Sequence, residues 1–179
     1  MIQCSQTLCE DYQDSFIFVD TTVLIHASLS DDFRAQLKGL VVAGCTLYTI
    51  SSVVYEFTRT ANMLSGYAER LQFIEDLGVV VQGRAEELLG ADYVFTVAYN
   101  LACGATGRGP SYTDSLLARM LYKYRQSNVY VMTANHRDMP PAIFDKVELI
   151  TVVLADEIAT EVIYRLSEEK LGSLLKKLQ

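Results

Sequence analysis

Short apolar runs alternate with amphipathic stretches along most of the chain, and this alternation predicts an α/β protein. The apolar runs are the length of strands, and most lack the alternation of polar and apolar residues that half-exposed strands show. Such runs are typical of strands that are buried on both faces of a parallel sheet. They predict five strands, at residues 16–19, 45–50, 79–81, 129–132 and 147–153.

Between these runs, apolar residues recur at helical spacing and predict the helices that cover the sheet. We expect Ser30 to open a helix that reaches about Ala43 and stops at Gly44, and Ser51 or Ser52 to cap the next one. Further helical segments are predicted at residues 21–27, 69–77, 84–103 with a break at Gly90, 111–124 and 154–179, with a loop at 104–110.

The order of these elements favours a doubly wound sandwich of three layers, in which a mostly parallel, roughly five-stranded central sheet is flanked by helices. The length of 179 residues predicts one domain, 1–179, with an N-terminal extension at 1–15 and a C-terminal helical tail at 154–179. No apolar stretch approaches the roughly 20 residues that cross a bilayer, so we expect no membrane span. The first 15 residues lack the pattern of a secretory signal, so we expect a cytoplasmic protein.

The charge of the chain is unevenly distributed. The net charge of -7 and the pI near 4.8 differ from the basic footprint that most nucleic-acid-binding proteins carry. Residues 100–137, however, hold five Lys or Arg residues against the single acid Asp114, and a local basic surface would suit a phosphodiester substrate. The cysteines form no close C-x-x-C pair, which predicts reduced, mostly buried thiols rather than a zinc site or disulfides. They are Cys4, Cys9, Cys45 and Cys103.

Four acidic residues are the candidates for the chemistry of this protein. Asp20 and Asp138 both follow predicted strands, whereas Glu56 and Asp114 lie on or beside helix faces that should meet the sheet. Ligands of open α/β sheets bind at the carboxyl ends of the strands, so these four side chains can converge there. Buried carboxylates repel one another unless a cation or raised pKa values offset the repulsion. An all-oxygen ligand set favours Mg²⁺ or Mn²⁺.

Each acid also has an ordinary structural interpretation. Asp20 could cap a helix, Asp114 could be the third residue of a capping box begun at Ser111, and Asp138 could be a turn residue before two prolines. Glu56 fits such a role less well, because no serine stands three residues before it. The joint pattern of the four acids is more specific than any one of them.

At these positions the chain resembles the PIN-domain nucleases, and in particular the VapC-type toxins, over about residues 16–153. The resemblance implies that Asp20, Glu56, Asp114 and Asp138 hold the metal and are catalytic. It also implies that Thr133 and Asn135, with Thr21 or Thr22, steady a ligand or a water molecule. The motifs that carry it are Asp20-Thr21-Thr22, Ser51-Ser52-Val53-Val54-Tyr55-Glu56, Thr113-Asp114-Ser115-Leu116-Leu117-Ala118 and Thr133-Ala134-Asn135-His136-Arg137-Asp138.

The resemblance implies a Mg²⁺- or Mn²⁺-dependent endoribonuclease that leaves 5′-phosphate and 3′-hydroxyl ends. The toxin role would add an antitoxin partner that blocks the acidic cleft, and a homodimer. One alternative is a PIN-like scaffold that binds RNA or protein without cutting. Another is a phosphatase of the haloacid-dehalogenase type with Asp20 as nucleophile. The phosphatase is disfavoured because Thr22 stands where that resemblance requires a second Asp.

Overall fold

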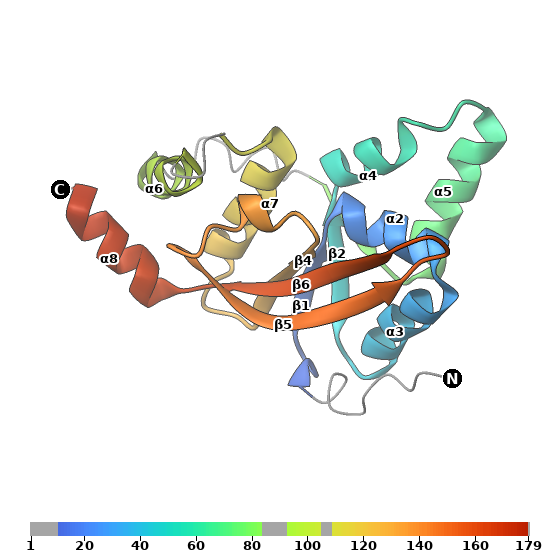
Figure 1. Ribbon diagram of the computed structural model, residues 1–179, viewed down its shortest axis with the longest axis horizontal. Coiled ribbons are helices and arrows are strands. Elements are labelled where there is room, and N and C mark those ends of the chain that lie inside the picture. The colour runs from blue at the N-terminus through green and yellow to red at the C-terminus, as the bar shows by residue number, and fades with distance from the viewer. Residues whose placement is uncertain (1–10, 84–92, 105–108, 179) are drawn as a thin grey trace.

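The computed structural model of the protein describes residues 11–83, 93–104 and 109–178 (Figure 1). The predicted break at Gly90 lies outside the described residues, as do residues 84–92 and most of the predicted loop at 104–110. Strands and helices alternate through the first two thirds of the chain, as the sequence predicts. In chain order the elements are β1 (Phe16–Val19), α2 (Thr21–Leu29), α3 (Asp31–Val42), β2 (Thr46–Ile50), α4 (Ser51–Thr58), α5 (Leu64–Asp76), β3 (Val80–Gln82), α6 (Tyr93–Gly104), α7 (Tyr112–Lys123), β4 (Val129–Thr133), the 3₁₀ turn η2 (His136–Asp138), β5 (Phe144–Val153), β6 (Ile158–Leu166) and α8 (Glu168–Leu178).

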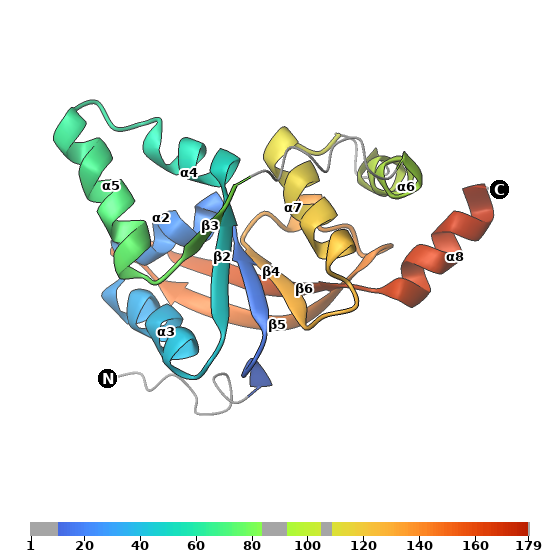
Figure 2. The ribbon, with the colours of Figure 1, turned by 180° about the vertical axis from the view of Figure 1, so that it is seen from behind.

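The described strands form one six-stranded mixed sheet in the order β3-β2-β1-β4-β6-β5. Strands β1 to β4 are parallel to one another, whereas β6 pairs antiparallel with both β4 and β5. The prediction of an α/β protein with a mostly parallel sheet is confirmed, and the sheet has one strand more than the roughly five expected. Opposite views show α2, α3 and α5 gathered on one side and α6, α7 and α8 on the other (Figures 1 and 2).

The predicted helical tail at residues 154–179 is wrong over its first half, where the chain forms β6. Ile158, Val162 and Leu166 are four residues apart, and a spacing of four places residues on one face of a helix and equally on one face of a strand. Pairing on both edges with β4 and β5 decides between the two. Only α8, in the second half, is helical.

Two helices end shortly before a glycine, and the predicted end of the first at Gly44 is confirmed. Gly44 after α3 has φ +97° and Gly78 after α5 has φ +72°, which are left-handed conformations that glycine adopts without strain. The Ser30 cap of α3 is also confirmed, because its hydroxyl accepts the Phe33 N–H at 3.3 Å. The predicted serine cap of α4 is wrong. Strand β2 runs directly into this helix, so that Ile50 takes the N-cap position without a side-chain hydrogen bond.

The connections between elements bring distant parts of the chain to one edge of the sheet. The chain leaves β1 directly into α2, leaves β2 directly into α4, and leaves β4 through two residues into η2. Because β1, β2 and β4 are parallel, these three exits lie at the same edge. None of the described helices has the length and apolar character that crossing a membrane would require.

Candidate functional site

A pocket of about 560 Å³ lies at this edge and contains all four predicted acids. Asp20 follows β1, Glu56 lies in α4, Asp114 in the first turn of α7, and Asp138 at the end of η2. Three of them are buried, with Asp20 and Asp114 5% exposed and Asp138 9% exposed. The structure therefore brings together four carboxyl groups that are separated by up to 118 positions in the sequence.

Asp20 is held by two hydrogen bonds, one to each carboxylate oxygen. Its Oδ1 accepts the backbone N–H of Thr21 at 2.6 Å, so Asp20 is also the N-cap of α2. Its Oδ2 accepts the hydroxyl of Thr133, from the end of β4, at 2.7 Å. A carboxylate oxygen has two lone pairs, so each oxygen retains one for a further ligand. The cap interpretation and the site interpretation of Asp20 are thus compatible.

Glu56 is oriented by two threonine hydroxyls from different elements. Oε2 accepts the Thr21 hydroxyl at 2.8 Å, and Oε1 accepts the Thr113 hydroxyl at 2.5 Å. The two bonds connect α4 to the first turns of α2 and α7. Thr21 therefore contacts both Asp20, through its backbone, and Glu56, through its side chain.

Asp114 and Asp138 each have a polar neighbour three residues away. Ser111 caps α7 by accepting the Asp114 N–H at 3.1 Å, and its own hydroxyl donates to Oδ2 of Asp114. Asp138 accepts a hydrogen bond from the amide of Asn135, whose backbone N–H in turn donates to the Thr133 hydroxyl at 2.9 Å. Asp114 is therefore hydrogen-bonded to the N-cap residue of α7 and also lines the pocket.

Burial and mutual repulsion oppose the charging of these acids. Burial raises the pKa of Asp20, and the charges of Glu56 and Asp138 raise it further, while the Thr133 and Thr21 hydrogen bonds act against the rise. Burial raises the pKa of Asp114 to about 7. The Ser111 hydrogen bond opposes that rise, and the charges of Asp20 and Asp138 and a hydrogen bond to Asp138 add to it.

The donor chemistry of the pocket fits a hard divalent cation, because carboxylate oxygens dominate it and, among the residues that the structure describes, neither histidine nor cysteine lines it. The carboxylates are not gathered closely enough to form a metal centre as they stand. Within the ranges 11–83, 93–104 and 109–178, no three Asp, Glu, His or Cys side chains form a group that could hold a metal ion. Binding would require the carboxylates to move closer together.

Two guanidinium groups, from Arg59 and Arg137, also line the pocket. Arg137 belongs to the basic segment noted in the sequence, whereas sequence analysis missed Arg59, just after α4, because it lies outside that segment. Of the other basic residues in that segment, Arg119 donates to the Thr96 hydroxyl at 2.6 Å and Lys123 lies over the Tyr124 ring. Arg108 lies outside the described residues.

Sequence analysis also missed a fully buried acid, Glu161 in β6. Its Oε1 lies 2.6 Å from Nδ1 of His26 in α2, and the charge of nearby Asp20 acts on it. Burial raises the pKa of Glu161 to about 8, although the hydroxyl of Thr22 opposes the rise, and burial lowers the pKa of His26. Both shifts favour a neutral pair. The sequence did contain a signal for Glu161, because it is the only Glu within the mostly apolar residues 158–166. The incorrect prediction of a helix there prevented its recognition as a buried acid.

Neither a scan against models of protein families nor a search of curated proteins gives a match to this chain. What the chain does is therefore argued below from the geometry of the acidic pocket.

Proposed function

We propose that the protein is a Mg²⁺- or Mn²⁺-dependent endoribonuclease of the PIN type, and that Asp20, Glu56, Asp114 and Asp138 hold the metal. The observation that supports this most strongly is the convergence of these four carboxyl groups in one pocket at the carboxyl edge of the parallel strands. Four carboxylates that lie together repel one another, which raises the free energy of the folded chain. A bound cation relieves this repulsion. Burial raises the pKa values of Asp20 and Asp114, and the charges of the neighbouring acids raise them further.

A divalent ion bound here would lower the pKa of a coordinated water and offset the charge that develops on the phosphate. The chain's own residues have three tasks. The Thr21, Thr133 and Ser111 hydrogen bonds keep carboxylates oriented toward the pocket. Arg59 and Arg137 supply positive charge beside the acids and would contact the phosphates that flank the scissile bond. Asn135 holds Asp138.

The resemblance to PIN-domain nucleases implies that hydrolysis leaves the phosphate on the 5′ end of one fragment and a hydroxyl on the 3′ end of the other. We propose RNA as the substrate, because the resemblance to VapC-type toxins points to it. A toxin role would add an antitoxin that blocks the pocket, and a homodimer. The toxin role is tested by whether expression of the chain alone arrests cell growth. The antitoxin is tested by whether a second protein relieves that arrest.

The test of the nuclease is an assay on a mixed RNA pool with Mg²⁺ or Mn²⁺. The wild type should cut RNA and lose activity in a chelator. Asp20→Asn and Asp114→Asn should each lower the rate by more than about 100-fold, since even residues that only support metal ligands are worth about 10- to 100-fold. Asp156→Asn, an exposed acid in the turn between β5 and β6, is the matched control and should cut like the wild type. Cutting that survives both pocket substitutions would refute the proposal.

The second candidate is a scaffold that binds RNA without cutting it. It is favoured by the lack of a ready group of metal ligands in the described part of the chain. For a scaffold, the same assay gives RNA binding but no cleavage in either metal, and Asp20→Asn leaves binding unchanged.

A further inference from the structure

A second pocket, of about 240 Å³, lies on one face of the sheet beside the C-terminal end of α7. The two pockets have no lining residue in common within the described ranges. Phe16 and Phe18 are two positions apart in β1, so both point to this face. Tyr48 of β2 is in register with Phe18, and Tyr124 directly follows α7. Four parallel strands therefore contribute to the pocket together with the segment that follows α7, since Gln82 lies in β3 and Val129 in β4.

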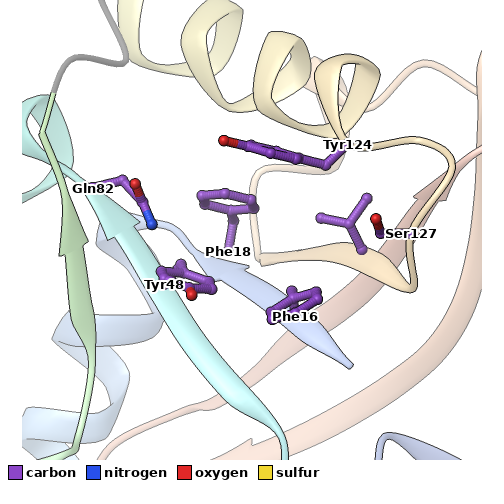
Figure 3. Close-up of a pocket in the computed structure, with 7 residues that line it drawn as sticks. Phe16, Phe18, Tyr48, Gln82, Tyr124 and Ser127 are labelled. Carbon is purple, nitrogen blue, oxygen red and sulfur yellow. The ribbon is translucent and has the colours of Figure 1, made fainter. Parts of the chain in front are cut away.

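The pocket is an aromatic surface that remains partly open to solvent. The ring of Tyr48 lies 5.9 Å from that of Phe16 and 5.7 Å from that of Phe18, measured between centroids. Phe18 is buried, whereas Phe16 and Tyr124 are each 37% exposed. Figure 3 shows Tyr124 over Phe18, with Phe16 and Tyr48 along the sheet beneath. The accessible faces of these rings are suited to stacking against another flat ring.

Among the residues that the structure describes, the polar groups of the pocket are few and uncharged. Gln82 and Ser127 line it together with the tyrosines, and no Asp, Glu, Lys or Arg of the described ranges does. The Gln82 side chain reaches into the space beside the rings (Figure 3). A carboxamide offers a donor and an acceptor side by side, which matches the paired groups on the edge of a nucleobase. The volume is below the roughly 300–1,000 Å³ of pockets for drug-sized ligands, so it suits a single ring system.

Helix α7 connects this pocket to the acidic one. Asp114 lies in its first turn and Tyr124 just beyond its last residue. Its 12 residues correspond to about 18 Å along the helix axis, so a polymer can reach both pockets where a mononucleotide cannot. Lys123 is exposed beside Tyr124, with Nζ 5.0 Å from the centre of that ring. Aromatic platforms next to basic side chains are how single-stranded nucleic acids are commonly held.

We propose that this aromatic pocket, made by Phe16, Phe18, Tyr48, Gln82 and Tyr124, stacks a base of a single-stranded RNA whose scissile phosphate lies in the acidic pocket. The proposal rests on the proposed nuclease function, because the acidic pocket supplies the other contact point of the strand. It identifies the substrate as unpaired RNA, since a base inside a duplex cannot enter a pocket lined by ring faces.

The sequence contains no tryptophan, which gives a direct test. Tyr124→Trp places a single indole at the pocket, and Tyr67→Trp places one on α5, where the native side chain is 45% exposed and outside the pocket. The probe is an adenine oligonucleotide of about 12 nucleotides, within the range that single-strand sites cover. With a chelator present to prevent cutting, it should quench Tyr124→Trp in a saturable way and leave Tyr67→Trp unchanged. An abasic strand of the same length should quench neither.

Loss of the rings should weaken binding of the same oligonucleotide. Tyr124→Leu and Tyr48→Leu should each raise the dissociation constant by about 5- to 150-fold, the range for one stacked base. Tyr124→Phe, which keeps the ring, and Tyr67→Leu should leave it unchanged. Melting curves of the four variants show that the fold is retained.

Several results would overturn the aromatic pocket as an RNA site. These are no quenching of Tyr124→Trp, equal quenching by the abasic strand, unchanged affinity in both leucine variants, or binding of free adenosine as tight as that of the oligonucleotide. The nuclease proposal is tested separately from the base site. If the oligonucleotide quenches Tyr124→Trp but the wild type cuts no RNA, the base site stands and the catalytic proposal falls. If the wild type cuts RNA and the leucine variants bind the oligonucleotide as tightly as the wild type, the catalytic proposal stands and the base site falls.

Discussion

Replacing Asp114 by Asn should make the metal-free protein more stable at neutral and higher pH. Asp114 is 5% exposed, and burial with the charges of Asp20 and Asp138 raises its pKa from the ordinary 3.8 to about 7. An amide of the same shape cannot ionise, yet it can still accept from the Ser111 hydroxyl and donate toward Asp138. The substitution therefore removes a buried charge while it keeps the local hydrogen bonds.

The expected size follows from linkage between protonation and folding. The difference between 3.8 and about 7 corresponds to about 4 kcal/mol. Because the folded-state pKa is the higher one, the folded chain holds a proton that the unfolded chain has lost. Ionisation of Asp114 therefore does not reduce the free energy of unfolding below about pH 4. Above that pH the free energy of unfolding falls, until the pH passes about 7. At pH 8 the Asp114→Asn variant should exceed the wild type by about 2–4 kcal/mol, or about 4–16 °C in Tm.

The assay is urea unfolding of both proteins in a chelator at pH 4, 6 and 8, followed by circular dichroism. The two proteins should be within about 1 kcal/mol of each other at pH 4 and should diverge as the pH rises. Asp156→Asn serves as the control and should follow the wild type at every pH, because its side chain is exposed. Parallel pH curves for wild type and Asp114→Asn would refute the claim that these acids form a repulsive cluster.

Three further predictions concern the surroundings of the acids. Mn²⁺ should raise the Tm of the wild type more at pH 8 than at pH 6, because protons compete for carboxyl groups of raised pKa, and Asp20→Asn should abolish the difference. Glu161→Ala should lower the free energy of unfolding by about 1–3 kcal/mol at pH 6, because His26 loses its partner. Glu161→Gln should lower it less. Equal losses for the two variants in urea titrations would contradict this. Tyr99→Phe removes the 2.8 Å hydrogen bond to the carbonyl of Asp138 and should weaken Mn²⁺ binding by about 10-fold, measured by titration.

Much of the fold could be predicted from the sequence because the four parallel strands are apolar runs with clear boundaries. β1, β2 and β4 lie within a residue of their predicted positions, and Gly44 ends α3 where expected. These features depend on local chemistry, namely buried β-branched and aromatic side chains and a left-handed glycine. A pattern along the chain is sufficient to reveal them.

β6 could not be predicted in the same way. Its apolar positions fit either a strand or a helix, and the decision comes from its pairing with β4 and β5, which the order of residues does not reveal. The same error hid Glu161, whose environment exists only after β6 is placed beside β4 and α2. Glu161 then meets His26, although the two are 135 positions apart.

The candidate site was predictable in its acids but not in its geometry. Sequence position at strand ends and helix starts indicated that Asp20, Glu56, Asp114 and Asp138 could converge, and all four line one pocket. The hydrogen bonds from Thr21 and Thr113 to Glu56 depend on how α2, α4 and α7 pack together. The aromatic pocket likewise combines the four parallel strands β1 to β4 and the segment that follows α7, and no spacing in the chain signals it.

The most direct test of the central claim is a titration with Mn²⁺ in which the free ion is followed by electron paramagnetic resonance. If the four carboxyl groups share a cation, the wild type removes Mn²⁺ from solution in a saturable way at pH 8. Glu56→Gln and Asp114→Asn should each weaken that binding by at least about 10-fold, while Asp156→Asn should not change it. Equal binding by all four proteins, or none by the wild type, would contradict the metal site on which the proposed function depends.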